Sequence, residues 1–248
     1  MNNLRVSFII ATCNGAQFIE EQLKSITQYL GSDGEIVICD DASDDNTIEV
    51  VERFVDERIK LFKFNERVGY QKNFERAANR ASGQFIFFSD QDDVCLPLRI
   101  PKSLDALRTK GCVFGDVIVV DRDLSVLEPS YFDWRGFKDI SVVRMILKPL
   151  AIGATMACTR EFLNKSIPFP ANVPHDHFLS CLAAFKGELV VIEDPVIKYR
   201  RHPSVVSETG RSSLRSLKVI LWERMLLLFS LVIRLISGSK LYRRRGGQ

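Results

Sequence analysis

The sequence predicts a doubly wound α/β fold, in which a mostly parallel sheet is flanked by helices. Within the first 90 residues, short apolar runs alternate with longer segments whose apolar residues recur at helical spacing. Each apolar run is followed by a polar segment, and two of these segments are rich in aspartate. Because ligands bind at the carboxyl ends of the strands in such sheets, the polar segments are predicted to be the functional loops.

The elements of this first half can be placed in order. Continuous apolar runs predict buried strands at residues 6–11, 35–39, 59–64 and 85–88. Helical spacing of apolar residues predicts helices over residues 18–30, 47–55 and 70–81. Glycines at positions 31, 34 and 83 stand where the first and the last of these helices are expected to end.

The pattern is less regular after residue 95. We expect helices over residues 97–107 and 176–185, and strands over residues 113–120, 189–192 and 196–199. Residues 145–159 contain the segment IGATMAC, which indicates a strand or a strand that turns into a helix. Residues 125–139 are irregular and rich in aromatic side chains, and we expect them to form a wall over the site.

Composition is that of a folded globular protein. The 248 residues are 46% hydrophobic and 26% charged, and the net charge of +3 is too small to predict a nucleic-acid partner. The six cysteines form no CxxC pair, which indicates reduced thiols in a cytosolic protein. The short apolar run near the amino terminus leads straight into a motif, so we interpret it as a first strand rather than a signal peptide.

Two acidic segments, ICDDASDDNT and FFSDQDDV, follow two of the predicted strands. Clustered carboxylates suit Mg²⁺ or Mn²⁺, and a carboxylate can also accept hydrogen bonds from a ribose or a nucleobase. The first segment is equally consistent with a turn and a helix N-cap, so both interpretations stay open. In the second, three carboxylates directly after FIFF repel one another unless a cation or ligand is bound, which favours a functional role.

Several common sites are absent from the sequence. It contains no P-loop, no GxGxxG and no GxSxG segment. His175 and His177 flank Asp176 at a spacing that does not place both imidazoles on one helical face, which argues against a zinc pair. The segment YRRHPSVVS carries Arg200 and His202 in a basic patch suited to a diphosphate, with a solvated loop as the alternative.

These motifs together resemble the family 2 glycosyltransferases, in the same order and at similar spacing. The segments are ATCNGAQFIEEQLKSI, ICDDASDDNT, RVGYQKNFERAANRASGQFIFFSDQDDV, IGATMA, PHDHF and YRRHPSVVS. The resemblance covers roughly residues 4–208 and is strongest to bacterial rhamnosyltransferase-like members that build surface polysaccharide. It implies a GT-A fold over residues 1–210 and transfer of a sugar from a nucleotide diphosphate donor with inversion at the anomeric carbon.

The resemblance also implies roles for individual residues. Asp176 would be the catalytic base, and the alternative for this carboxylate is an N-cap of the following helix. Asp92, with His202, would hold Mg²⁺ or Mn²⁺, while Asp93 has no assigned role. The residues implied to bind the nucleotide sugar are Thr12, Asn14, Asp40, Asp41, Asp90 and Arg200.

The substrates stay open at this point. The resemblance favours rhamnose from dTDP-rhamnose as donor and a glycan or lipid-linked saccharide as acceptor in cell-surface polysaccharide synthesis. A related transferase that uses a UDP-hexose or UDP-N-acetylhexosamine is the first alternative. A non-catalytic sugar-nucleotide-binding subunit, and a nucleotidyltransferase or phosphatase with two metals, are the others.

Residues 211–248 differ in composition from the rest of the chain. Residues 217–236 are mostly apolar but include Glu223, Arg224 and Arg234, and a cluster of basic residues follows. Burying those charges in a bilayer would be costly, so we expect no spanning helix. We expect an amphipathic helix that lies on anionic lipid at the inner face of the cell membrane. The alternative is a helix that packs on the domain or on a second subunit in a homo-oligomer.

Overall fold

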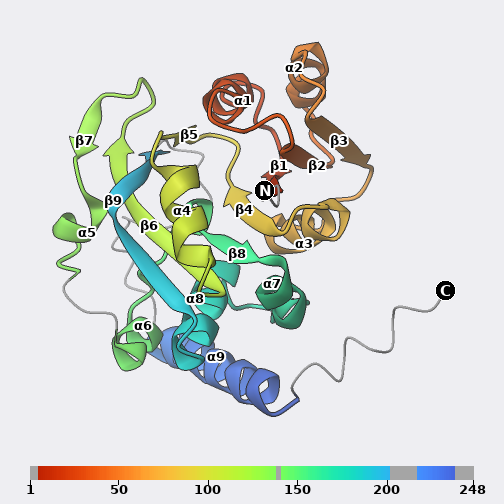
Figure 1. Cartoon of the computed structure of the whole chain (residues 1–248). Coiled ribbons are helices and arrows are strands. Elements are labelled where there is room, and N and C mark those ends of the chain that lie inside the picture. Colours follow the sequence, from red (N-terminus) through yellow and green to blue (C-terminus); the bar gives the residue numbers. More distant parts are fainter. Residues whose placement is uncertain (1–4, 138–140, 202–216, 238–248) are drawn as a thin grey trace.

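The computed structural model describes residues 5–137, 141–201 and 217–237. One sheet runs through it in the order β3-β2-β1-β4-β8-β6-β9-β5, with β7 paired to β6 (Figure 1). The pairs β1–β2, β2–β3 and β1–β4 are parallel, whereas β8 is antiparallel to both β4 and β6. The predicted α/β fold with flanking helices is therefore confirmed. The sheet, expected to be mostly parallel, is parallel in its first half and mixed in its second, where only β6–β9 is parallel.

The elements of the first half follow the prediction closely. The strands are β1 (Val6–Thr12), β2 (Glu35–Asp41), β3 (Ile59–Phe64) and β4 (Phe85–Ser89), and the helices are α1 (Ile19–Thr27), α2 (Thr47–Arg53) and α3 (Tyr70–Arg80). Strand β1 lies between β2 and β4, and almost every residue of these three strands is buried. A strand that is covered by helices on both sides needs apolar side chains on both of its faces.

The second half contains more elements than the sequence predicted. They are β5 (Val94–Cys95), α4 (Arg99–Leu107), β6 (Cys112–Val120), β7 (Val126–Glu128), α5 (Tyr131–Trp134), α6 (Val142–Leu147), the 3₁₀ turn η1 (Gly153–Thr155), β8 (Ala157–Thr159), α7 (Arg160–Ser166), α8 (His175–Phe185), β9 (Leu189–Arg200) and α9 (Leu217–Ser237). The segment IGATMAC forms a 3₁₀ turn that leads into the short strand β8, and α7 follows directly, so the expected strand that turns into a helix is present but begins only at Ala157. The two strands expected after residue 188 form the single strand β9.

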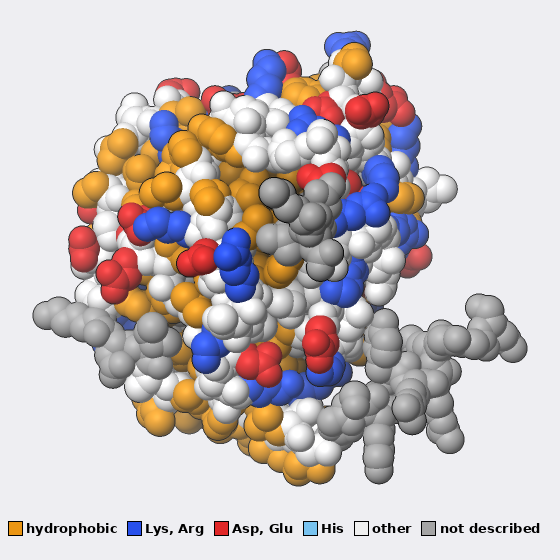
Figure 2. Space-filling model, viewed as in Figure 1, with side chains coloured by type: hydrophobic (Ala, Val, Ile, Leu, Met, Phe, Trp, Pro, Cys, Tyr) orange, Lys and Arg blue, Asp and Glu red, His pale blue; other side chains and the backbone are white. Residues whose placement is uncertain are grey.

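Helix α9 presents large apolar side chains to solvent. Among them, Trp222 is 56% exposed and Phe229 is 64% exposed. The helix runs along the lower edge of the molecule in Figure 1, and apolar side chains cover the same edge in Figure 2. Within the described residues, no helix is long and apolar enough to cross a membrane.

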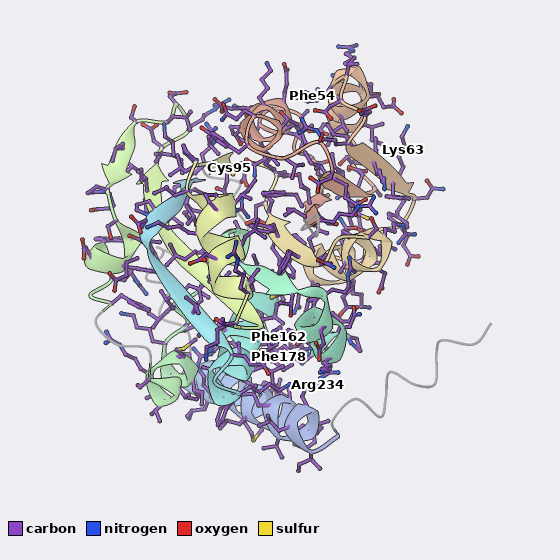
Figure 3. The ribbon with its side chains drawn as sticks, in the orientation of Figure 1. Phe54, Lys63, Cys95, Phe162, Phe178 and Arg234 are labelled. Carbon is purple, nitrogen blue, oxygen red and sulfur yellow. The ribbon has the colours of Figure 1, made fainter. Side chains whose placement is uncertain are left out.

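The inner side of α9 packs on the domain and includes Arg224 and Arg234. Leu227 and Leu231 are buried against the body of the protein. Arg234 donates to the carbonyl oxygen of Pro168 at 2.6 Å, and its guanidinium lies 6.0 Å from the ring of Phe178 on α8 (Figure 3). Arg224 reaches Nδ1 of His177 at 3.4 Å. The face of α9 that packs on the protein therefore combines buried leucines with Arg224 and Arg234, and the opposite face exposes large apolar side chains, unlike the polar outer face of an ordinary surface helix. The basic residues expected after it, and the boundary near residue 210, lie outside the described residues.

Candidate active site

The polar loops after β1, β2 and β4 meet at one edge of the sheet. Thr12 and Asp40 are partners in the β1–β2 register, and the Thr12 hydroxyl donates to Asp40 at 2.9 Å. Asp40 also accepts from the backbone N–H of Ser43 at 2.9 Å. Asn14 accepts from the backbone N–H of Asp44 at 2.8 Å. These bonds join the loop after β1 to the loop after β2, so Thr12, Asn14 and Asp40 together hold the expected nucleotide end of the site in one shape.

Asp41 binds the segment that leads into α3. Its carboxylate accepts from the backbone N–H groups of Val68 at 2.9 Å and Gly69 at 2.8 Å, and it pairs with Arg76 at 3.2 Å. Gly69 has a φ of +83°, which favours glycine over any residue with a side chain. The carboxylate is buried, so its hydrogen bonds fix the loop between β3 and α3.

The segment SDQDD is fixed to the loop after β1 by Gln91. Its side-chain amide accepts from the backbone N–H of Cys13 at 2.9 Å and donates to the carbonyl of Cys13 at 3.1 Å. A Cβ atom on Gly15 would lie 2.4 Å from the Gln91 oxygen, so a larger residue there would push the Gln91 amide away from Cys13. Sequence reasoning missed this role, because a glutamine among aspartates gives no signal of what it bonds.

The three aspartates of this segment have different surroundings. Asp93 is buried, and one of its oxygens accepts from the backbone N–H of Arg200 at 3.0 Å while the other has no hydrogen-bond partner among the described residues. Burial, and then the charges of Asp92 and Asp90, raise the pKa of Asp93 well above its usual range. Asp93 thus joins the loop to the end of β9.

Asp90 and Asp176 act on each other across the site. Burial, and then the negative charges of Asp92 and Asp176, raise the pKa of Asp90 to about 7. The Tyr70 phenol shares these surroundings, since burial, Asp176 and Asp90 raise its pKa to about 12. The fold therefore brings Asp176, from the second half of the chain, close enough to the loop of Asp90 and Asp92 for its charge to affect the pKa of Asp90.

The start of α8 positions Asp176. Its carboxylate is half-buried and accepts from the backbone N–H of the next residue, His177, at 2.7 Å. The N-cap of α8 is Pro174 and Asp176 lies inside the first turn, so the N-cap alternative for Asp176 is wrong. The preceding His175 is buried against aromatic rings, 4.9 Å from Phe74 and 5.4 Å from Phe88 between ring centroids. Packing of His175 in the core leaves the next residue, Asp176, at the surface of the site.

Two buried arginines, Arg200 and Arg99, donate hydrogen bonds to backbone carbonyls near the carboxylates. The Arg200 guanidinium is buried, pairs with Glu21 and donates to the backbone carbonyl of Asp92 at 2.8 Å, so it holds the loop rather than pointing into the site. Arg99 was not expected from the sequence. It is fully buried, donates to the carbonyl of Ala154 at 2.6 Å, and its charge opposes the raised pKa of Asp90.

The carboxylates fit a cation that takes most of its ligands from substrate. Among the residues that the structure describes, no three His, Cys, Asp or Glu side chains form a preformed metal site. His202, expected as a ligand, lies outside the described residues. Mg²⁺ is commonly held by one or two carboxylates together with substrate phosphates and water. Burial, and then the negative charges of Asp92 and Asp176, raise the pKa of Asp90, and a cation bound beside these carboxylates would offset the effect of those charges.

The protein has acidic loops at the carboxyl ends of parallel strands and a carboxylate on a later helix that influences one of them. This arrangement matches the class of GT-A glycosyltransferases. Comparisons agree with this class. The family model described as glycosyl transferase family 2 matches residues 7–166. The chain therefore belongs to glycosyl transferase family 2, as the sequence motifs indicated.

Named relatives support this membership. The dTDP-rhamnosyl transferase RfbG of Shigella flexneri is 33% identical over 78% of this chain and 71% of its own length. The Escherichia coli enzyme WfgD, named as a UDP-Glc:alpha-D-GlcNAc-diphosphoundecaprenol beta-1,3-glucosyltransferase, is 31% identical over 87% of this chain and 84% of its own. Among solved structures, Staphylococcus aureus TarS (residues 1–349) with UDP-GlcNAc has a TM-score of 0.67 at 19% identity, over 96% of this chain and 74% of that one. The mannosyltransferase PcManGT of Pyrobaculum calidifontis, solved with GDP-Man and Mn²⁺, has a TM-score of 0.60 at 20% identity, over 96% of this chain and 77% of that one.

Proposed function

We propose that the protein is a metal-dependent inverting glycosyltransferase that transfers rhamnose from dTDP-rhamnose to a glycan or lipid-linked saccharide in cell-surface polysaccharide synthesis. The feature that supports this most directly is the electrostatic influence of Asp176, on α8, on the pKa of Asp90 in the acidic loop after β4. The similarity to a dTDP-rhamnosyl transferase supports the choice of donor.

In this proposal the nucleotide lies over the loops after β1 and β2. Thr12, Asn14 and Asp40 keep these loops in place, and Asp41 fixes the segment that faces them. Asp90 lies toward the ribose. Arg200 acts as a positioning residue, because its side chain supports the backbone of Asp92.

Asp176 accepts the proton of the acceptor hydroxyl as that oxygen attacks the anomeric carbon. The new bond between the acceptor oxygen and the anomeric carbon forms as the bond to the diphosphate breaks, and the nucleoside diphosphate leaves with the electron pair. A single displacement inverts the anomeric centre. Asp92, with His202, would hold Mg²⁺ or Mn²⁺, which supplies positive charge to the leaving diphosphate when it is bound.

A UDP-hexose or UDP-N-acetylhexosamine is the second candidate donor. The named UDP-glucose enzyme matches more of this chain than the rhamnosyl transferase does, which favours keeping it. A panel of nucleotide sugars, each with Mg²⁺ or Mn²⁺, separates the two candidates by thermal shift and by release of nucleoside diphosphate. If no nucleotide diphosphate stabilises the protein and chelation changes nothing, the proposed function is wrong.

We also propose that the outward face of α9 lies on the inner surface of the cell membrane. Its exposed apolar residues and the basic residues that follow in the sequence match the pattern of an interfacial helix on anionic lipid. Replacing Trp222 and Phe229 together by serine should strongly reduce binding to phosphatidylglycerol vesicles. The control is Val55→Ser, since Val55 is an exposed apolar residue (97% exposed) in the loop between α2 and β3, which lies on the opposite side of the molecule from α9 in Figure 1. Undiminished vesicle binding by the double variant would refute this surface.

A further inference from the structure

The side chain of His177, the residue after the predicted base, joins three helices. It lies in the first turn of α8 and is only 2% exposed. Its Nε2 atom lies 2.8 Å from the carbonyl oxygen of Met145 on α6, and its Nδ1 atom lies 3.4 Å from Nη1 of Arg224 on α9. The three helices pack together at the lower edge of the molecule in Figure 1. Both ring nitrogens of His177 are therefore used in contacts with neighbouring helices.

These two contacts require the neutral imidazole in one tautomer. A carbonyl oxygen can only accept a hydrogen bond, so Nε2 of His177 carries the proton and donates to Met145. A guanidinium can only donate, so Nδ1 keeps its lone pair and accepts from Arg224. A second proton on the ring would place an N–H group against the Arg224 cation. Burial, and then the charge of Arg224, lower the pKa of His177, while the Met145 carbonyl and Asp176 raise it, and the lowered pKa agrees with a neutral ring.

The Arg224 guanidinium also reaches the end of α6. Its Nη2 atom donates to the carbonyl oxygen of Leu147, the last residue of that helix, at 3.4 Å. Leu227, three residues further along α9, is fully buried, so Arg224 lies on the side of α9 that packs on the domain. One guanidinium thus contacts both the end of α6 and the imidazole in the first turn of α8, and it holds this turn against its two neighbouring helices.

Asp176 lies between two anchored histidines. His175 packs among aromatic rings, with centroids 4.9 Å from Phe74 and 5.4 Å from Phe88, and His177 is held by α6 and α9. Residues two apart on a helix are separated by about 200° around its axis, so the two imidazoles anchor opposite sides of the first turn. The Asp176 carboxylate accepts from the backbone N–H of His177 within this turn. The direction of the carboxylate therefore depends on the rotation of the turn, which the two histidines fix.

We propose that His177 and Arg224 are positioning residues for the base, so that the inner side of α9 helps to set the direction of the Asp176 carboxylate. This inference rests on the proposed function, because it takes Asp176 to be the base. Neither positioning side chain contacts a substrate in this proposal. Arg224 holds the imidazole, the imidazole holds the first turn of α8, and the turn directs Asp176. The inner side of α9 thereby has a role separate from the membrane contact proposed for its outer face.

The kinetic test follows release of dTDP from dTDP-rhamnose with water as the acceptor. The water oxygen bonds to the anomeric carbon, its proton goes to Asp176, and dTDP leaves with the electron pair. Arg224→Gln should lower kcat about tenfold and leave KM for dTDP-rhamnose unchanged, because the base is misdirected while the donor loops are intact. Arg224→Lys keeps a charged donor and should restore most of the loss. Wild-type kcat in Arg224→Gln would overturn the proposal.

Arg234→Gln is the matched control. Arg234 also lies on the inner side of α9, but it donates to the carbonyl oxygens of Ile167 and Pro168, at 3.2 Å and 2.6 Å, in the segment before α8. This variant should loosen the packing of α9 and keep the wild-type kcat, and a loss equal to that of Arg224→Gln would overturn the proposal.

A double-mutant cycle tests whether Arg224 acts through the imidazole. Phenylalanine at position 177 keeps an aromatic ring but can neither donate to Met145 nor accept from Arg224. His177→Phe alone should lower kcat about tenfold, and adding Arg224→Gln to it should lower kcat no further. If the two losses multiply to about 100-fold, Arg224 acts by another route and the proposal is wrong.

Two measurements without turnover separate failure of this inference from failure of the proposed function. The pKa of His177, followed by NMR with its signal assigned by its loss in His177→Phe, should rise in Arg224→Gln because the Arg224 charge lowers it in the wild type. Exchange of the His177 amide hydrogen, which Asp176 accepts, should quicken in the same variant. Arg234→Gln should change neither. If neither changes in Arg224→Gln, the inference is wrong. If both change but the wild type turns over no nucleotide sugar, the first turn is positioned as inferred and the proposed function fails.

Discussion

Glu35 offers the sharpest test of how the parallel half of the sheet is held together. It begins β2 at the edge of the sheet away from the site and is only 2% exposed. One carboxylate oxygen accepts from the Ser7 hydroxyl at 2.6 Å and the Ser82 hydroxyl at 2.7 Å, and the other pairs with Lys60 at 2.6 Å. The side chain thus ties β2 to β1, to β3 and to the loop before β4.

The magnitude follows from the pKa of Glu35. Burial alone would raise it, but Lys60, Ser7 and Ser82 together lower it from 4.5 to about 2. At about 1.36 kcal/mol per pH unit, this difference corresponds to roughly 3 kcal/mol of stability. Because Lys60 is substantially exposed and its charge is screened by solvent, we expect about 2 kcal/mol. The contribution is present above pH 4.5 and is lost as the pH falls from 4.5 toward 2.

The assay is thermal unfolding of the wild-type protein and Glu35→Gln at a series of pH values. At pH 7 the variant should melt about 4–8 °C lower, and the difference should narrow below pH 4.5. Glu52→Gln is the control, since Glu52 pairs with Lys63 in an exposed ion pair and should cost under about 1 kcal/mol. A difference between wild type and Glu35→Gln that is as large at pH 3 as at pH 7 would refute the reasoning.

Further predictions concern the site. Asp176→Asn should lower turnover at least about 100-fold and keep the thermal shift by nucleoside diphosphate, and unchanged turnover would exclude Asp176 as the base. Asp92→Asn should remove the extra thermal shift that Mn²⁺ gives in the presence of nucleotide; a retained metal effect would place the cation elsewhere. Asp93→Asn keeps an oxygen for the Arg200 N–H and should unfold in urea close to wild type, whereas Asp93→Ala should lose about 1–3 kcal/mol; equal stabilities would contradict the role given to that bond. Gly69→Ala should lose about 1 kcal/mol or more in the same measurement, because φ there is +83°, and full stability would contradict the need for glycine.

The sequence predicted the parallel half of the fold well because each of its signals is local. Strands such as β1 and β2 are short apolar runs, and helices such as α3 repeat their apolar residues at helical spacing. Strand β9 shows where local signals fail. Pro195 interrupts its apolar pattern and suggested two strands, but the structure keeps one strand by shifting the β6–β9 register at Asp116, the partner of Pro195. The short elements β5, α5 and α7 were missed because a few residues give too little periodicity.

In the site, too, local sequence signals predicted the positions of residues but not their contacts with distant segments. The positions of the aspartates followed from where the apolar runs ended, but their partners did not. Asp41 binds Val68 and Gly69, and Asp93 binds the backbone of Arg200. Such bonds between distant segments use backbone N–H groups, which every residue but proline carries, so the sequence holds no record of them. The resemblance to a family supplied Asp176, whereas nothing local indicated that it would face Asp90.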